Sequence, residues 1–183
     1  MKNNIHNELF RKLIHIFFGL FFILLYLYSN TQIVIFSSLL LTLAAILNKF
    51  IFKKIKIIYK RSFSLGTILY PLSIALIAWL WLPTYPSVFI FAILILSISD
   101  SAAALFGSLS SKKLPFFNKT ISGSSSFFIT TLIISLLLYK KIEIVPILTT
   151  SLILTIVEFF FVYGLDNLTL TIIASYLFYY FNF

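Results

Sequence analysis

Long apolar runs separated by short polar or basic segments dominate the chain. The runs lie near residues 10–28, 32–52, 64–82, 86–108, 121–139, 143–163 and 167–182. A helix needs about 20 apolar residues to cross a hydrocarbon core ~30 Å thick. The pattern therefore predicts an all-α fold, a polytopic membrane bundle of about seven transmembrane helices that forms a single domain over residues 1–183.

Composition supports a membrane location. Hydrophobic residues make up 61% of the chain and charged residues only 10%, against roughly 45 to 50% apolar residues in a soluble domain. The absence of cysteine excludes disulfides, thiolate nucleophiles and thiolate metal sites. The net charge of +9 resides between the apolar runs, where basic residues set topology and meet lipid headgroups, so we expect no nucleic acid partner.

The distribution of Lys and Arg predicts the orientation in the membrane. Of the 14 basic residues, only Lys140 and Lys141 fall at ends that would be extracytoplasmic if the N-terminus is inside. Cytoplasmic loops carry an excess of Lys and Arg, so this orientation is the expected one. It places the protein in a membrane with a cytoplasmic N-terminus, and the small size favours a bacterial inner membrane.

The acidic residues gather on the same predicted face. Four of the five fall in its cytoplasmic half, and only Glu143 lies outside: the four are Glu8, Asp100, Glu158 and Asp166. The positive-inside rule concerns Lys and Arg and gives no reason for carboxylates to gather there. We therefore expect the active site at the cytoplasmic face.

Two motifs have helical i, i+3, i+4, i+7 spacing, which places their members on one face. The first consists of Glu8, Arg11, Lys12 and His15, and the second of Asp100, Ala103, Ala104 and Gly107. The first can coordinate phosphate, or it can be a basic helix start with a satisfied histidine. A carboxylate costs about 2.5 to 3.5 kcal/mol at the centre of a membrane helix, which favours a functional Asp100. The alternative is a packing face whose aspartate pairs with a lysine.

The segment "NKTISGSSS", residues 118–126, leads into the fifth run. Lys119 offers a cationic group, while Gly123 and its serine neighbours lie where a helix N-terminus exposes unpaired backbone N–H groups. The segment is a candidate phosphate cradle. An ordinary serine-rich helix cap explains the same residues without a ligand.

The segment "VEFFFVYGLDNL" ends with two carboxylates and an amide, Glu158, Asp166 and Asn167. These are hard oxygen ligands of the kind that Mg²⁺ takes beside substrate phosphates. A glycine-terminated helix followed by a turn explains Gly164, Asp166 and Asn167 equally well. It does not explain Glu158, because an acid within an apolar run is costly unless it faces a polar site.

Taken in order, the motifs resemble the polytopic CTP-dependent lipid kinases, the family of dolichol kinase, phytol kinase and yeast-type diacylglycerol kinase. The family pattern is E-x-x-R-K-x-x-H, D-x-x-A-A-x-x-G, a basic loop, K-T-x-x-G-S, and an acid eight residues before D-N. This chain matches it from Glu8 to Asn167, with Thr120 and Ser124 completing the third motif. It departs from the pattern at Ser99 and Ser111, where the family usually has glycine, and in lacking a proline soon after D-N.

The resemblance implies a kinase that transfers the γ-phosphoryl group of CTP to the hydroxyl of a membrane lipid alcohol, with Mg²⁺ as cofactor. It implies Asp100, Glu158 and Asp166 as catalytic and metal-binding residues, with Asp100 expected to orient or deprotonate the hydroxyl. The residues expected to bind nucleotide or phosphate are Arg11, Lys12, His15, Lys119, Thr120, Gly123, Ser124 and Asn167.

Two other classes stay open at this stage. Phosphatidate cytidylyltransferase, or CDP-diacylglycerol synthase, looks similar in the middle region, but its closing P-G-H-G-G and D-R-x-D signature is missing. A membrane transporter or scaffold without enzymatic activity is the second alternative, although broken helices and inverted halves are not evident. The particular lipid alcohol and the oligomeric state are not predicted.

Overall fold

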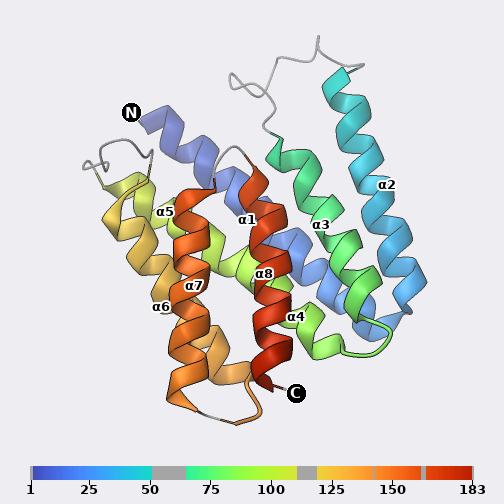
Figure 1. Cartoon of the computed structure of the whole chain (residues 1–183). Coiled ribbons are helices and arrows are strands. Elements are labelled where there is room, and N and C mark those ends of the chain that lie inside the picture. Colours follow the sequence, from blue (N-terminus) through green and yellow to red (C-terminus); the bar gives the residue numbers. More distant parts are fainter. Residues whose placement is uncertain (1, 51–64, 111–118, 142, 162–163, 183) are drawn as a thin grey trace.

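Helices make up all the regular secondary structure in the computed structural model, which describes residues 2–50, 65–110, 119–141, 143–161 and 164–182. In chain order they are α1 (Lys2–Tyr28), α2 (Thr31–Phe50), α3 (Gly66–Trp81), α4 (Pro86–Leu94), η1 (Ile95–Ser99), α5 (Asp100–Leu109), α6 (Ile121–Leu138), α7 (Ile144–Phe160) and α8 (Leu165–Asn182). The all-α prediction is confirmed for these residues. The helices lie where the apolar runs predicted them, with the fourth run divided into α4, η1 and α5 (Figure 1).

Some of these helices are long and apolar enough to span a membrane. In the described part of the chain there are 4 such segments, Leu9–Tyr28, Thr31–Asn48, Pro86–Leu109 and Ile121–Leu138. They are compatible with a multi-pass membrane protein. The α3 and α7 helices are shorter, with 16 and 17 residues, so the number of crossings stays a prediction.

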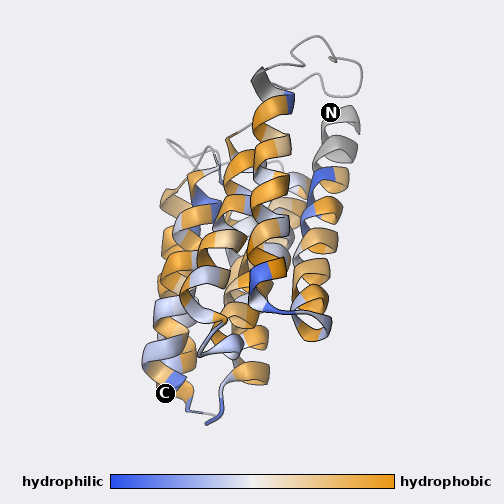
Figure 2. Cartoon of the chain, turned by 90° about the vertical axis from the view of Figure 1, so that its right-hand side faces the viewer, coloured by the Kyte–Doolittle hydropathy of each residue, from blue (hydrophilic) through white to orange (hydrophobic). Residues whose placement is uncertain are grey.

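Large apolar side chains cover the outside of the bundle. Figure 2 shows the hydrophobic colour extending along the helices over most of their length. Exposed examples are Phe17, Leu24, Phe36, Leu137, Val145 and Leu152. Soluble monomers rarely expose apolar surface on this scale, whereas lipid tails solvate it at no cost. Such a surface is compatible with a protein that is surrounded by lipid.

The segment Pro86–Leu109 forms the centre of the bundle. Of its span, 67% is buried inside the protein, compared with 17% to 28% for the other candidate spans. It begins at Pro86, which suits a first helical position because proline lacks the N–H that would be unpaired there. Its first part, α4, is apolar on nearly every side, as expected for a helix surrounded by other helices. Parts of it pack against α1, α3, α6 and α8.

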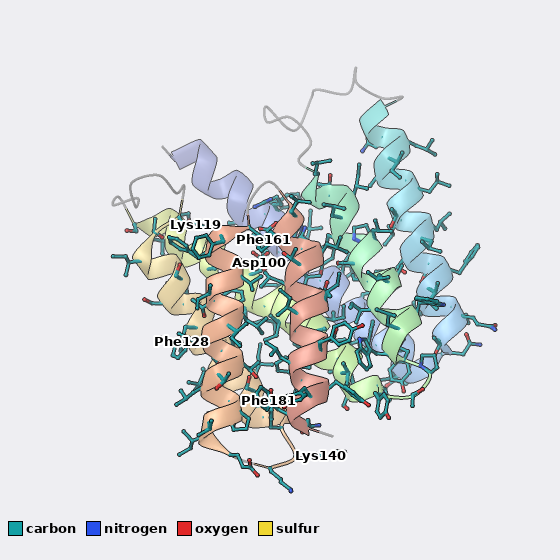
Figure 3. All side chains as sticks on the ribbon, in the orientation of Figure 1. Asp100, Lys119, Phe128, Lys140, Phe161 and Phe181 are labelled. Atoms are coloured by element: carbon teal, nitrogen blue, oxygen red, sulfur yellow. The ribbon has the colours of Figure 1, made fainter. Side chains whose placement is uncertain are left out.

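The up-and-down course of the chain brings several helix ends together. The starts of α3, α6 and α8 and the end of α7 lie at the end of the bundle where the chain begins (Figure 1). Lys119 and Asp100 lie toward this end, and Lys140 and Phe181 toward the other (Figure 3). We call the first the site end. Several basic residues behind the predicted orientation lie outside the described residues, namely those within 53–61, Lys112 and Lys113, and so does Ser111, where the chain departs from the family pattern.

Candidate functional site

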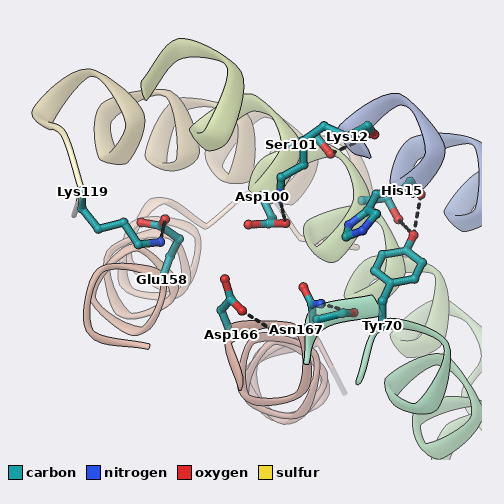
Figure 4. A network of polar contacts seen from close by, with 11 residues as sticks. Lys12, His15, Tyr70, Asp100, Ser101, Lys119, Glu158, Asp166 and Asn167 are labelled. Atoms are coloured by element: carbon teal, nitrogen blue, oxygen red, sulfur yellow. Dashed lines mark hydrogen bonds and ion pairs between the residues drawn. The ribbon is translucent and has the colours of Figure 1, made fainter. Parts of the chain in front are cut away.

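Two ion pairs, one buried and one partly buried, link segments that are distant in sequence. The Lys12 ammonium group on α1 donates to Asp100 Oδ2 on α5, and the Lys119 ammonium group donates to Glu158 Oε1 on α7. The partners are 88 and 39 positions apart. A buried charge without a partner is strongly destabilising, so each lysine and its acid depend on one another. Both pairs are drawn in Figure 4.

Most of the polar side chains at this end of the bundle are shielded from solvent. The buried members and their exposed fractions are Lys12 4%, His15 6%, Asp100 4%, Thr120 6%, Glu158 3% and Asn167 4%. Charged residues are almost never fully buried in a protein unless they are paired. A group of this kind within an apolar bundle indicates a functional site, because apolar packing alone would be more stable without it.

A π-helical turn, η1, positions Asp100. It spans Ile95–Ser99, and the backbone N–H of Asp100 donates to the carbonyl of Ile95 five residues earlier. A π turn inserts one residue into an α-helix and rotates all that follows, and such turns occur frequently at functional sites. No local feature of the sequence predicted this turn. The extra residue sets the direction in which the Asp100 side chain points from the helix.

Tyr70 on α3 ties α1 to this π turn. Its hydroxyl donates to the backbone carbonyl of His15 and lies 2.9 Å from Ser97 Oγ. Its ring also lies against the His15 ring, with centroids 4.2 Å apart. A Cβ atom on Gly19 would overlap the Ser97 side chain, so glycine is required for α1 to lie this close to η1. Ser101 Oγ adds a long contact of 3.4 Å to the Lys12 carbonyl.

The start of α6 packs closely against α5. Thr120 is the N-cap, and its hydroxyl accepts a hydrogen bond from the Gly123 N–H at 3.1 Å. A Cβ atom on Gly123 would lie 2.8 Å from the carbonyl oxygen of Ala103 and 3.3 Å from the Cα of Gly107. Gly123 is therefore required by helix packing, and a Cβ atom on Gly107 would make a tight contact of 3.0 Å with Thr120 Oγ1.

This arrangement changes the expectation for a phosphate cradle. The Gly123 N–H is already bonded to Thr120, so for Thr120 and Gly123 the structure shows the cap and the packing contact rather than an open cradle. The small-residue face of α5 likewise packs on α6. Lys119 lies just before the cap, and Ser124 Oγ is buried without a hydrogen-bond partner among the described residues. Those two groups remain candidates for phosphate contact.

The start of α8 is fixed against α3. Gly164 has φ of +93°, a left-handed conformation suited to glycine, and a Cβ atom there would overlap the backbone of Gly66. Asn167 donates from Nδ2 to the Gly66 carbonyl at 3.0 Å. Asn167 therefore joins two helices, a structural contact that the sequence did not predict. Asp166, directly before it, is only half-buried and faces the other acids (Figure 4).

Three carboxylates, those of Asp100, Glu158 and Asp166, turn toward a common space (Figure 4). One oxygen of Glu158 accepts from Lys119, while its other oxygen, Oε2, is buried and has no hydrogen-bond partner among the residues that the structure describes. Asp166 precedes the apolar part of α8. Burial, followed by the Asp100 charge, raises the pKa of Asp166, and Lys12 and Lys119 act in the opposite sense. The acids and lysines thus act on one another electrostatically.

The acids have the chemistry of a magnesium site that is completed by a ligand. Within the described residues, no three His, Cys, Asp or Glu side chains form a ready-made metal cluster. Mg²⁺ usually binds through one or two carboxylates together with substrate phosphates and water, rather than in an all-protein cage. The unpartnered Oε2 of Glu158 and the facing carboxylates of Asp100 and Asp166 fit that mode of binding.

The structure therefore brings together most of the predicted residues. Lys12, His15, Lys119 and the three acids meet at the site end, and Arg11 lies partly exposed beside Lys12 on α1. Tyr70, Ser97 and Ser101 were missed. The only signal for Ser97 and Ser101 was their polarity within the run "LSISDS". No local signal existed for Tyr70.

Comparisons with protein-family models, with curated proteins and with solved structures find no match to this chain.

Proposed function

We propose that the protein is a CTP-dependent kinase that phosphorylates the hydroxyl of a membrane lipid alcohol, such as a polyprenol, a phytol-type isoprenoid or diacylglycerol. One observation supports the proposal above the others. The motifs that resemble the kinase family are scattered over the chain, yet five of their charged members meet in one largely buried cluster at the end of an apolar bundle: Lys12, Asp100, Lys119, Glu158 and Asp166. Residues with no shared role would have no reason to meet there.

The charges suit a phosphate-bearing substrate. Lys12 and Lys119 supply ammonium groups from opposite sides of the three acids (Figure 4). In phosphoryl transfer the protein mainly positions the groups and stabilises charge on the phosphate oxygens. Lysine is a common point-charge ligand for phosphate, so these two residues would contact the nucleotide phosphates, with Arg11 and Ser124 nearby.

Asp100, Asp166 and Glu158 would hold Mg²⁺ together with the phosphates. A bound magnesium ion would offset negative charge on the β- and γ-phosphate oxygens. The chain itself supplies the orientation: the π turn and the Tyr70 contacts fix Asp100, while the α3 contact of Asn167 fixes the start of α8 and with it Asp166.

The transfer step is a displacement at phosphorus. The bond between the γ-phosphorus and the β–γ bridging oxygen breaks, a bond from the lipid hydroxyl oxygen to that phosphorus forms, and CDP leaves. The hydroxyl proton passes to a carboxylate. Asp100 is engaged by Lys12 and is suited to orienting the hydroxyl, whereas the raised pKa of Asp166 makes it the better proton acceptor.

The lipid and the side of the membrane follow from other features. The apolar outer surface allows an acceptor to approach sideways from the bilayer. The excess of Lys and Arg at the site end in the sequence favours a cytoplasmic site, where CTP is present. The choice of CTP rests on the family resemblance.

The experiment uses the purified chain in detergent with Mg²⁺, a panel of lipid alcohols, and phosphatidate. CTP labelled at the γ-phosphate is compared with CTP labelled at the α-phosphate. The proposal predicts γ label in a lipid monophosphate, and no label with Asp100→Asn. Lys141→Met, an exposed lysine at the opposite end, serves as the control with normal turnover.

The other outcomes are equally clear. Label from the α position in a CDP-lipid would mean that the protein is a cytidylyltransferase. Label in neither product, with ATP also inactive, would favour a transporter or scaffold. Wild-type turnover by Asp100→Asn would contradict the assigned role of that residue.

A further inference from the structure

We propose that Lys12 and Lys119 are internal counter-ions of the site, which occupy the carboxylates when no ligand is bound and make the binding of cation and phosphate mutually dependent. The inference rests on the proposed function only in assuming that the site takes a divalent cation and a phosphate. It concerns the affinity of the site rather than its reaction.

The two ammonium groups already lie on the carboxylates of the site. Each lies directly on an oxygen of one acid, Lys12 on Asp100 and Lys119 on Glu158. These are carboxylates that a divalent cation would use. In this state the lysines hold the place of the cation, and they are also the groups that a phosphate would need.

The positive and negative charges of the site nearly cancel. Asp100, Glu158 and Asp166 carry three negative charges, and Lys12 and Lys119 carry two positive ones, a sum of −1 for these five groups. Because the cluster is largely shielded from water, charges within it interact strongly. A change in one charge therefore requires a compensating change in another.

Either ligand, binding alone, would leave a charge of the site without a favourable partner. A cation that binds to the acids meets an ammonium group at short range, or displaces it to a place without a partner. A phosphate that draws a lysine away leaves a buried carboxylate unpaired, which is unfavourable. When both bind, the cation takes the carboxylates and the phosphate takes the lysines, so every charge keeps a partner.

The structure contains the elements that such an exchange requires. Lys119 lies outside the helix, just before the N-cap residue of α6, and its side chain is 20% exposed, so it can turn away from Glu158. The Glu158 side chain is only 4% exposed, and its Oε2 has no hydrogen-bond partner within the described part of the chain. That oxygen offers an entering cation a first ligand before any ion pair opens. A purely structural ion pair would not need to leave it unsatisfied.

The test measures Mn²⁺ binding to the full chain in detergent by electron paramagnetic resonance, without nucleotide. We expect Lys119→Met to bind Mn²⁺ roughly tenfold or more tightly than the wild type, because the competing positive charge is gone. Lys12→Met should change in the same direction. Lys141→Met, which removes an exposed lysine at the opposite end, should bind Mn²⁺ like the wild type.

Thermal unfolding gives a second measurement in case Lys12→Met folds poorly. In EDTA, Lys119→Met should unfold at a lower temperature than the wild type, and saturating Mn²⁺ should raise its unfolding temperature by more than it raises that of the wild type. Affinity equal to or weaker than wild type in folded Lys119→Met overturns the inference, as does the absence of Mn²⁺ binding by every variant. Turnover in the labelled-CTP assay is read separately, so kinase activity with unchanged Mn²⁺ affinity refutes this inference alone.

Discussion

Replacing Asp100 with asparagine tests whether the Lys12–Asp100 pair supports both stability and function. The substitution keeps the shape of the side chain and an oxygen that can accept from Lys12, but it removes the negative charge. Lys12 is only 4% exposed, so its ammonium group would remain buried and uncompensated. Removing one partner of a buried ion pair costs about 3 to 5 kcal/mol. We expect a loss of about 3 kcal/mol in the free energy of unfolding, at the low end, because the amide oxygen still accepts a hydrogen bond. This loss corresponds to roughly a hundredfold change in the unfolding equilibrium constant.

A second substitution separates the two roles. In Asp100→Asn combined with Lys12→Met, no unpaired charge is left, because the ammonium group has been replaced by an apolar chain of similar length. The double variant should therefore recover most of the lost free energy of unfolding, since such pairs can often be replaced by apolar residues without loss. Transfer should be absent in both variants, because the carboxylate is missing from both.

The assay is equilibrium unfolding in mixed micelles of a mild detergent and sodium dodecyl sulfate, followed by tryptophan fluorescence and circular dichroism. The three variants, Asp100→Asn, Lys12→Met and the double, form a double-mutant cycle with the wild type. If the two single losses add in the double variant, the residues do not interact, and the reasoning from the buried pair is refuted.

Two further substitutions test the packing and the alignment of the site. Gly123→Ala should destabilise the protein by about 1 to 3 kcal/mol, because its Cβ would lie 2.8 Å from the Ala103 carbonyl oxygen. The control in the same unfolding assay is Ser125→Ala, at an exposed position on the same helix. Equal losses of stability in the two variants would refute the close contact. Tyr70→Phe removes the hydroxyl that bridges His15 and Ser97, and the buried groups left unsatisfied should lower the free energy of unfolding by about 1 to 3 kcal/mol. In the transfer assay kcat should fall more than KM rises. An unchanged kcat in folded protein would contradict a positioning role.

Sequence reasoning succeeded where the pattern is local. The apolar runs determined where helices form, because a chain in lipid must satisfy its backbone hydrogen bonds within each segment. The cost of placing acids in apolar runs marked Asp100 and Glu158 as functional candidates before any contact was known. A serine-rich helix cap within residues 118–126 was likewise an alternative from the sequence, and the structure contains a cap there, with Thr120 as the N-cap residue.

Reasoning from the sequence did not reach contacts made across the bundle. It did not predict that Gly123 lies against Ala103 and Gly107, or that the Asn167 amide reaches the Gly66 carbonyl, 101 positions away. The short-range pattern is the same with or without these contacts, so it could not predict them. The phosphate and nucleotide roles of these two residues stay predictions.

By itself the sequence determined a helical membrane protein whose acids and lysines lie near the ends of apolar runs, because helix formation and lipid solvation depend on the residues of each segment alone. Only the tertiary structure decided which lysine faces which acid, that a π turn directs Asp100, and that Tyr70 ties α1 to that turn. These features depend on the rotation and crossing of helices about one another. Small residues such as Gly19 set that crossing through contacts made across the bundle.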